Sequence, residues 1–253
     1  MKHIINPISY QLKDENLLND YIKNGFVSIK NLINIENLKN FQVELEESLQ
    51  LFLGNNYSYF ENINYLDKND QSKLYEFHLN SSKLFSISTL SNEIYNVVKI
   101  LNKNLPLKLN SNGYLLGLPR DSRLAYDFHQ EGNYMRGAGK IYNIHFPIFH
   151  KSTIENGTMS ILIDSHKEGL LPFEKKRLSE NSYTDLIPQN IDKLVEKYKE
   201  GFCELDLGDC LIFNENLIHK SNFNDTDKCR SVGVWRAFGD FDKAVKKLNP
   251  EEL

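Results

Sequence analysis

The sequence predicts a mainly β protein with a helical N-terminal section, in which a β-sandwich or barrel packs against helices. Two observations lead to this prediction. The first third of the 253 residues repeats apolar side chains at helical spacing, whereas from about residue 107 the chain consists of short strand-like runs separated by turn residues. Because no internal repeat or low-complexity linker interrupts this order, we expect one domain over 1–253, with mostly helical support over about 1–105 and a β core over about 106–240.

The helical section contains three segments with the spacing of an amphipathic helix. Segments 14–25 and 35–54 repeat apolar residues every three or four positions, and each ends at a glycine that can stop a helix. Between them, residues 26–33 (FVSIKNLI) alternate like a strand. Residues 84–101 have the pattern of a third helix.

The β core is predicted from nine short runs, which are LKLN, GYLLGL, AYDFHQ, KIYNIHFPIF, TMSILI, FCELDL, CLIFNE, NLIHKS and SVGVWRAF. Turn signals at 155–157, 207–209 and 222–225 separate several of them, and Asn156-Gly157 and Gly208-Asp209 are expected to set strand register. A polar, partly helical insertion at 164–200 interrupts the strands. Long insertions in compact folds are often lids, and a surface excursion is the alternative.

Composition excludes several classes of function. Net charge is −4 and the Lys and Arg residues are scattered, which argues against a nucleic-acid partner. No stretch has the apolar length of a signal peptide or a membrane span, so we expect no membrane partner. The three cysteines lack C-x-x-C spacing and are expected to be buried reduced thiols, which is typical of a cytoplasmic protein. The sequence gives no indication of oligomeric state.

Two His-x-acid triplets are candidates for a metal site. One is His129 with Glu131, the other His166 with Glu168, and about one such triplet is expected by chance in a chain with 7 histidines and 34 acidic residues. A non-haem Fe(II) centre uses two histidines and one carboxylate on one face of the metal and leaves the other face open. The second histidine therefore has to come from a distant strand.

His219 is the candidate for that second histidine. Four expected strands separate it from His129, enough to bring the chain around a sandwich or barrel, whereas only two separate it from His166. We therefore favour His129, Glu131 and His219 and expect His166 in a turn or in the lid. The four strands lie at about 141–149, 158–163, 202–206 and 210–214.

Arg230 follows His219 by eleven residues, across the turn NFNDTD. Iron enzymes that use 2-oxoglutarate hold its far carboxylate, and the planar fork of arginine binds a carboxylate through two hydrogen bonds. Ser221 lies two residues beyond His219, faces the same side of a strand and can donate a hydroxyl to the same carboxylate.

The motifs around these residues resemble the phytanoyl-CoA dioxygenase (PhyH) family of Fe(II)/2-oxoglutarate-dependent oxygenases. FHQEGNYMRG is similar to the family's H-Q-D-x-x-Y stretch. HFPIFHKSTIENGTMSILIDSHKEG is similar to its W-x-P-L … N-G-x-x … P-G-S-H-K-x-G segment. LDLGDCLIFNENLIHKSNFNDTDKCRSVGVWRAF resembles its G-D … H-x-S-x-x-N … R-x-S-x-x-x-R ending. The resemblance extends from NGFVSIKNLI to RAFGDF, which is most of the chain.

The resemblance implies a double-stranded β-helix, that is, a jelly-roll or cupin-like barrel flanked by helices. It also implies Fe(II) at His129, Glu131 and His219, 2-oxoglutarate at Arg230 and Ser221, and O2 as the second cosubstrate. The implied activity is that of a dioxygenase that hydroxylates or otherwise oxidises a C–H bond of a small molecule. Two departures concern the ligand and lid geometry: the family's usual Asp is Glu131 here, and its P-G-S-H turn is IDSH.

Five further residues are candidate substrate contacts. His145 points into the barrel mouth by strand alternation, with a core histidine as the alternative. Tyr134 and Arg136 follow the metal motif, and Gln130 lies between two of its ligands. Arg236 shares a sheet face with Arg230 by period two, so it either reaches an anionic substrate or pairs with an acidic side chain. These polar groups favour a polar or anionic small molecule.

Two other functions fit the same sequence. A non-catalytic jelly roll that binds a small molecule is favoured by Glu131 and the altered IDSH turn. A cupin-type sugar isomerase or epimerase would use a histidine base without 2-oxoglutarate, and Arg230 argues against it. Succinate formation from 2-oxoglutarate distinguishes all three. A halogenase needs a vacant position for halide, which Glu131 occupies.

Overall fold

The computed structural model describes residues 2–10, 15–84, 90–110, 113–177, 179–180 and 182–239, without the side chains of 15, 78–84 and 91. The helices are α1 (Glu15–Asn24), α2 (Ile35–Leu53), α3 (Tyr59–Asn69), α4 (Gln71–Leu84), α5 (Ser91–Leu101), α6 (Glu131–Tyr134) and α7 (Ile191–Lys197), with a 3-10 turn η1 (Ser165–Glu168). The strands are β1 (His3–Ile5), β2 (Phe26–Ile29), β3 (Lys108–Asn110), β4 (Tyr114–Gly117), β5 (Ile141–Pro147), β6 (Met159–Leu162), β7 (Phe173–Arg177), β8 (Thr184–Pro188), β9 (Glu200–Cys203), β10 (Cys210–Asn214), β11 (His219–Ser221) and β12 (Arg230–Phe238).

Two sheets form the β core, as the sequence predicts. The larger has the order β2-β10-β5-β12-β3, with β4 also paired to β12, and the smaller has the order β1-β9-β6-β11. The described strands make a sandwich of these sheets and do not close into a barrel, which refines the expected jelly-roll barrel. The run AYDFHQ, expected as a strand, is irregular in the structure except for one two-residue bridge between His129 and His219.

The register of β5, β10 and β12 decides which side chains face the space between the sheets. His145 pairs with Val234 and with Leu211, so these three lie on one face of the larger sheet. Alternate residues such as Ile144 and Trp235 lie on the other face, in the apolar cluster shared with the helices. Both faces of β5 are therefore covered, and all seven of its residues are buried.

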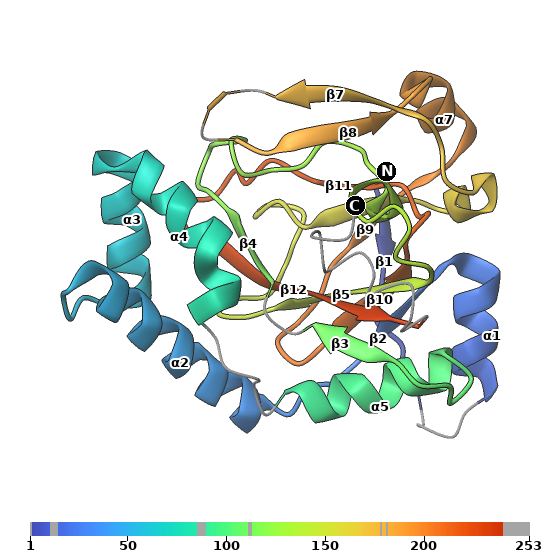
Figure 1. Ribbon diagram of the computed structural model, residues 1–253, viewed down its shortest axis with the longest axis horizontal. Coiled ribbons are helices and arrows are strands. Elements are labelled where there is room, and N and C mark those ends of the chain that lie inside the picture. Colours follow the sequence, from blue (N-terminus) through green and yellow to red (C-terminus); the bar gives the residue numbers. More distant parts are fainter. Residues whose placement is uncertain are drawn as a thin grey trace.

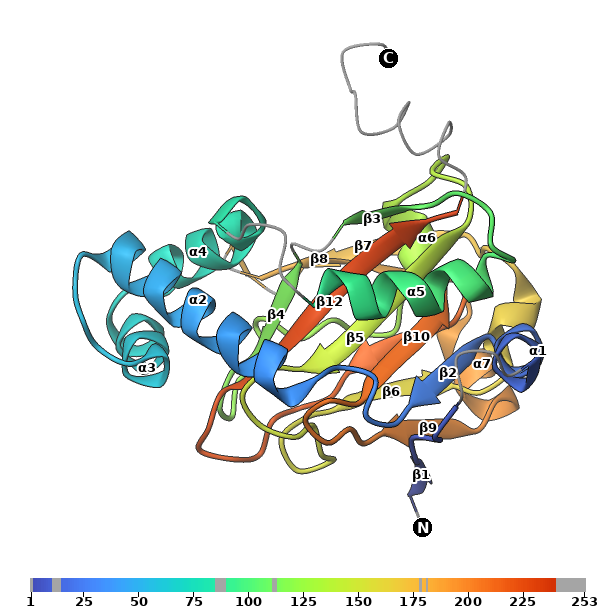
Figure 2. The same cartoon turned by 90° about the horizontal axis from the view of Figure 1, so that it is seen from below.

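Helices cover the outer face of the larger sheet (Figure 1), and Figure 2 shows α5 and the start of α2 lying across its strands. Local signals fix the ends of α2: the Asn34 side chain accepts hydrogen bonds from two backbone N–H groups of its first turn, and Gly54 ends it at φ 67°. The predicted helices at 14–25 and 35–54 are confirmed as α1 and α2. The third, at 84–101, is confirmed over α5, and its residues 85–89 lie outside the described part.

Two helices, α3 and α4, and one N-terminal strand, β1, were not expected. The stretch that forms α3 and α4 is rich in Asn, Ser and Tyr, which are weak helix formers. Its apolar residues, including Ile63 and Phe77, are buried in the main core, so packing outweighs propensity. In the N-terminal section, β1 pairs in parallel with β9, and β2, which had been predicted, pairs with β10.

The insertion at 164–200 is partly helical, as predicted, through η1 and α7. It also contains an antiparallel hairpin, β7–β8, that was not expected. His166 lies in η1, outside the β core, as expected for a turn or lid residue. Within the described residues, no helix combines the length and the apolar character that crossing a membrane requires.

Candidate active site

Three side chains from distant parts of the chain meet on the inner side of the sandwich. His129 precedes α6, Glu131 is the first residue of α6, and His219 begins β11. The backbones of the two histidines exchange hydrogen bonds of 2.9 and 3.1 Å, which places their side chains side by side. One ligand atom from each of the three residues lies within 4.8 Å of the others, and all three residues are buried.

Hydrogen bonds fix which nitrogen of each imidazole can bind a metal. His129 Nδ1 lies 2.7 Å from the carbonyl oxygen of Asp127, and His219 Nδ1 lies 2.9 Å from that of Leu217. A carbonyl oxygen only accepts, so each Nδ1 carries the proton and donates it, and each Nε2 keeps its lone pair. Burial lowers the pKa of both imidazoles, and the pKa of His219 falls well below its usual value, with the neighbouring His129 as a second cause. Both rings are therefore neutral ligands at neutral pH.

The carboxylate of Glu131 has two different neighbours. Its Oε2 lies 3.9 Å from His129 Nε2 and faces the histidines. Its Oε1 accepts from Arg236 Nε at 2.7 Å and lies 2.5 Å from Nη2 of the same arginine. Of the two interpretations offered for Arg236, the structure shows the pair with an acidic side chain. Arg236 also lines the cavity described next, so its contact with a substrate stays a prediction.

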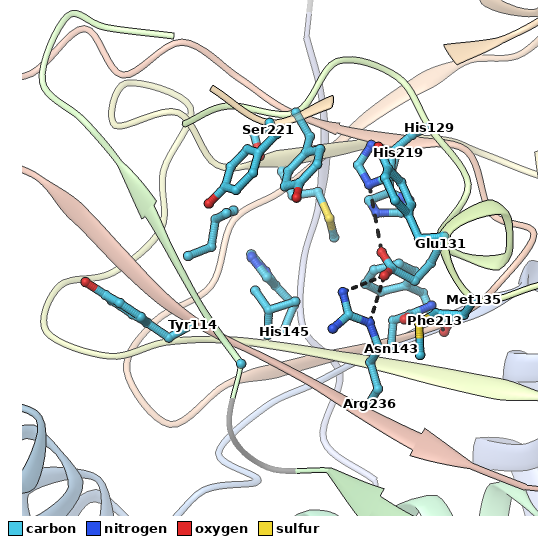
Figure 3. A pocket seen from close by; sticks show the side chains of 17 residues that line it. Tyr114, His129, Glu131, Met135, Asn143, His145, Phe213, His219, Ser221 and Arg236 are labelled. Carbon is cyan, nitrogen blue, oxygen red and sulfur yellow. Dashed lines mark hydrogen bonds and ion pairs between the residues drawn. The ribbon is translucent and has the colours of Figure 1, made fainter. Parts of the chain in front are cut away.

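A cavity of about 320 Å³ opens beside the three residues (Figure 3). Ligand sites in proteins measure about 300–1,000 Å³, so this one suits a small molecule. Tyr126, Tyr134 and Tyr183 line it, and the Tyr126 and Tyr183 rings stack at 4.0 Å. Ser221 lines it as well, on the same strand as His219.

His145 points into this cavity from β5 (Figure 3). It is 4% exposed, and its Nδ1 has no hydrogen-bond partner among the described residues. Burial, helped by the positive charge of Arg230, lowers the pKa of His145 to about 3, so the ring is neutral. The alternative offered for His145, a core histidine held by hydrogen bonds, does not describe its Nδ1.

Arg230 does not line the cavity but is buried next to it, at the start of β12. Its Nε donates to the carbonyl oxygen of Asn156 at 3.1 Å, and it packs against Gly117, where a Cβ would lie 3.3 Å from Nε. Its Nη1 is buried without a partner in the part of the chain that the structure describes. Burial lowers the pKa of Arg230 to about 10, so the guanidinium remains charged at neutral pH.

The other candidate substrate contacts are already engaged elsewhere. Tyr134 lines the cavity, yet its hydroxyl donates to the Thr184 carbonyl and accepts from the Leu186 N–H of β8, each at 3.0 Å. Gln130 is fully buried and forms three hydrogen bonds to backbone groups of residues 169, 171 and 216. Arg136 bonds the side chain of Asn133 and lies over the ring of Phe173. The structure brings neither Gln130 nor Arg136 to the cavity.

Several residues that line the cavity were missed by the sequence reasoning. Asn143 alternates with His145 along β5, so the period-two argument that found His145 also identifies it. Its Oδ1 is buried with no partner among described residues. Tyr183 reaches the cavity from the hairpin side of the insertion, and no local pattern marks it. The role of the Asn156 carbonyl at Arg230 likewise depends on the fold.

The donor set fits a divalent metal such as Fe(II). Two neutral imidazole nitrogens and one carboxylate oxygen converge from one side, and the cavity lies on the other, which is the arrangement of a facial triad. The second candidate pair does not form such a cluster. Glu168 instead makes an ion pair with Lys197 and a hydrogen bond with Tyr198.

Comparison with known proteins agrees with this geometry. A family model described as "Phytanoyl-CoA dioxygenase (PhyH)" matches residues 119–232, which include the three clustered residues and Arg230. No curated protein sequence matches the chain.

Three solved structures have similar folds. EctD from S. alaskensis, solved with 2-oxoglutarate and 5-hydroxyectoine, has a TM-score of 0.58 at 12% identity, covering 98% of this chain and 84% of its own. EvdO2 from Micromonospora carbonacea var. aurantiaca, complexed with 2-oxoglutarate, has a TM-score of 0.56 at 13% identity, covering 92% and 93%. The epimerase SnoN, in complex with Fe3+, alpha ketoglutarate and nogalamycin RO, has a TM-score of 0.55 at 14% identity, covering 88% and 82%. At these identities the likeness establishes the fold.

Proposed function

Because the family model described as "Phytanoyl-CoA dioxygenase (PhyH)" matches residues 119–232, which include the clustered residues, we propose that the chain is an Fe(II)- and 2-oxoglutarate-dependent dioxygenase that oxidises a C–H bond of a small, polar molecule. The observation that carries this proposal is the buried cluster of His129, Glu131 and His219 beside a cavity of about 320 Å³. Fe(II) held there would couple the oxidative decarboxylation of 2-oxoglutarate by dioxygen to the oxidation of the substrate.

The chain's own residues prepare the site for the metal. The carbonyl oxygens of Asp127 and Leu217 orient the two imidazoles and keep their Nε2 atoms unprotonated. Their burial excludes competing water, and the lowered pKa of each histidine means that the site needs no deprotonation at neutral pH. Glu131 supplies the one negative charge of the donor set.

Arg230 and Ser221 are the proposed partners of the far carboxylate of 2-oxoglutarate. The unpartnered Nη1 of Arg230 supports this assignment, since a buried charged donor without an acceptor is costly and an anionic ligand would satisfy it. Ser221 adds a hydroxyl from the cavity wall. His145 lines the cavity, and its Nδ1, which has no partner among the described residues, is proposed to contact the same cosubstrate or the bound substrate.

The substrate is proposed to be small and polar because the cavity wall combines tyrosine rings with the unpartnered polar atoms of Asn143 and His145. The oxidative outcome is proposed as hydroxylation or another oxidation at a C–H bond. Structures with the same fold include an epimerase and a carbocyclase that depend on alpha ketoglutarate, so the fold itself does not fix the outcome.

The three cysteines are buried and unpaired, which supports a reducing compartment such as the cytoplasm.

Succinate production tests the proposed function. The purified chain is incubated aerobically with Fe(II), 2-oxoglutarate and ascorbate, first alone and then with a panel of polar small molecules. We expect slow succinate formation without substrate, faster formation with a substrate, and none from His219→Ala. A folded wild-type protein that forms no succinate across the panel would contradict the proposal and favour a non-catalytic binding protein. Turnover of a sugar without 2-oxoglutarate would favour an isomerase.

A further inference from the structure

The contact between Arg236 and Glu131 supports an inference that goes beyond the proposed function and rests on it. Arg236 directs two N–H groups at one oxygen of the carboxylate, Oε1, at 2.7 Å from Nε and 2.5 Å from Nη2. The other oxygen, Oε2, faces His129. The two oxygens of Glu131 are thus divided between an arginine and the histidine cluster.

This division matters because a carboxylate can offer a metal either one oxygen or both. If both oxygens of Glu131 bound the metal, the second would occupy one of the positions that a facial triad leaves open for cosubstrates. Two charge-assisted hydrogen bonds from Arg236 engage Oε1 and keep it from binding the metal. We propose that Arg236 is a positioning residue that reserves Oε1 of Glu131, so that the glutamate binds the metal through Oε2 alone.

The same contact accounts for a glutamate at this position. An aspartate is shorter by one methylene, roughly 1.5 Å. From the same backbone position its carboxylate cannot both reach Arg236 at 2.5–2.7 Å and face His129 as Oε2 does. Glu131 and Arg236 are therefore a matched pair, in which the longer acid bridges the arginine and the metal.

Charge adds a second consequence. Arg236 brings a positive charge to a donor set with one negative charge, so it weakens the binding of a bare cation and favours an anionic ligand at the loaded site. Removing it should strengthen binding of the metal alone and weaken binding of 2-oxoglutarate to the metal-loaded protein. A merely structural arginine has the opposite effect on the metal, because its loss would misplace Glu131 and weaken binding.

The test uses Mn(II) affinity and the visible absorption spectrum of bound Co(II), both measured without dioxygen or turnover. We expect Arg236→Met to bind Mn(II) about three- to tenfold more tightly than the wild type. Its Co(II) bands should weaken, as they do when a further oxygen joins the coordination sphere. Its 2-oxoglutarate affinity in the Mn(II) form should fall. Arg236→Gln, which is also neutral, should change in the same directions and serves if the Met variant does not fold.

A matched control is Arg123→Met. Arg123 is also a partly buried, ion-paired arginine, with Asp121 at 2.6 Å and Asp67 at 2.5 Å, and it lies outside the cavity lining. This variant should leave the Mn(II) affinity and the Co(II) spectrum unchanged. In a Glu131→Asp background, Arg236→Met should leave the Co(II) spectrum unchanged, because the contact that reserves one carboxylate oxygen is already broken.

The outcomes separate this inference from the proposed function. A wild type that binds neither metal overturns both. A wild type that binds Mn(II) and Co(II), with an Arg236→Met variant of equal or weaker Mn(II) affinity and an unchanged Co(II) spectrum, overturns the role of Arg236 alone.

Discussion

At the residue scale, the account depends on which histidines bind metal. His219 offers a neutral Nε2 beside that of His129, whereas His166 lies in η1 outside the β core. We expect His219→Ala to lose stoichiometric Mn(II) binding and His166→Ala to keep it, as measured by calorimetry on folded proteins. Full metal occupancy in His219→Ala would contradict the assignment.

Arg230 is the second residue with a specific expectation. Losing a buried, charge-assisted pair should cost about 2–5 kcal/mol of 2-oxoglutarate binding, and Arg230→Lys should lose much of it as well, because a point charge cannot replace the fork. Calorimetry on the Mn(II)-loaded protein measures this cost. Arg120→Ala is the control, since its ion pair with Asp227 is exposed. Unchanged affinity in Arg230→Ala would rule out the assignment.

The residues that the sequence could identify are those whose partners follow from spacing. Strand count chose His129 over His166, and period two placed Arg236 on the face of its sheet that lines the cavity. The partner of Arg236 was open between a substrate and an acid, because the position of Glu131 depends on where α6 begins. Contacts made by backbone groups, such as the Asn156 carbonyl on Arg230, leave no trace in side-chain patterns.

At the scale of elements, the hairpin β7–β8 is attached to the metal loop. Asp185 of β8 accepts a hydrogen bond from the Asp127 N–H at 3.2 Å, and Tyr134 bonds two backbone groups of β8. The hairpin therefore supports the loop that carries His129. Whether the insertion moves as a lid stays a prediction.

Asp185 gives this attachment a pH dependence. Burial raises its pKa from 3.8 to about 6, with the nearby charge of Asp127 as a further cause. A carboxyl whose folded pKa lies above its unfolded value binds protons more tightly when folded, so its stability contribution is present below pH 4 and is lost as pH rises through about 6. The loss is of the order of 1–3 kcal/mol.

We therefore expect Asp185→Asn to melt at a higher temperature than the wild type at pH 7 and to lose the wild type's decline between pH 4 and 6. The amide oxygen can still accept from Asp127 N–H, so the hydrogen bond is kept while the buried charge is removed. Melting curves across this pH range measure the effect. Parallel curves for the two proteins would contradict it.

The elements that sequence patterns predicted are those with strong local signals, and those that were missed depend on tertiary packing. α2 has a cap at each end. α3 also has a local signal, the capping box of Ser58 and Glu61, which the sequence reasoning overlooked. The bodies of α3 and α4 are rich in weak helix formers and bury their apolar residues in the core. The hairpin is mostly exposed along β7, so its side chains lack the alternation of a half-buried strand.

At the scale of the whole molecule, one apolar cluster extends from the helices to the larger sheet. It contains Leu45 of α2, Ile94 of α5, Ile144 of β5 and Trp235 of β12. This continuity supports the single domain that the sequence predicts. The sandwich, by contrast, could not be distinguished from a closed barrel, because closure depends on pairing between strand edges that are distant in the sequence.

Close packing in this core makes Gly233 intolerant of substitution. A Cβ at this position would lie 2.2 Å from the ring of Phe146, its partner across β5 and β12. Overpacking of this kind costs about 1–3 kcal/mol, so we expect Gly233→Ala to lower the free energy of unfolding by that amount. Adding Phe146→Leu should recover part of the loss, as measured by urea denaturation. Strictly additive losses would contradict the steric account.

The central claim is that Fe(II) at His129, Glu131 and His219 and 2-oxoglutarate bind together, with the far carboxylate of 2-oxoglutarate at Arg230, which is buried next to the cavity. The most direct test is an anaerobic titration of Fe(II) into the protein with 2-oxoglutarate, following the visible charge-transfer absorption of the iron–2-oxoglutarate chelate. The account predicts a band that saturates at one Fe(II) per chain, persists in His166→Ala, needs more 2-oxoglutarate in Arg230→Ala and is absent from His219→Ala. A folded wild type that develops no such band at saturating Fe(II) and 2-oxoglutarate, or a His219→Ala variant with the wild-type band, would contradict it.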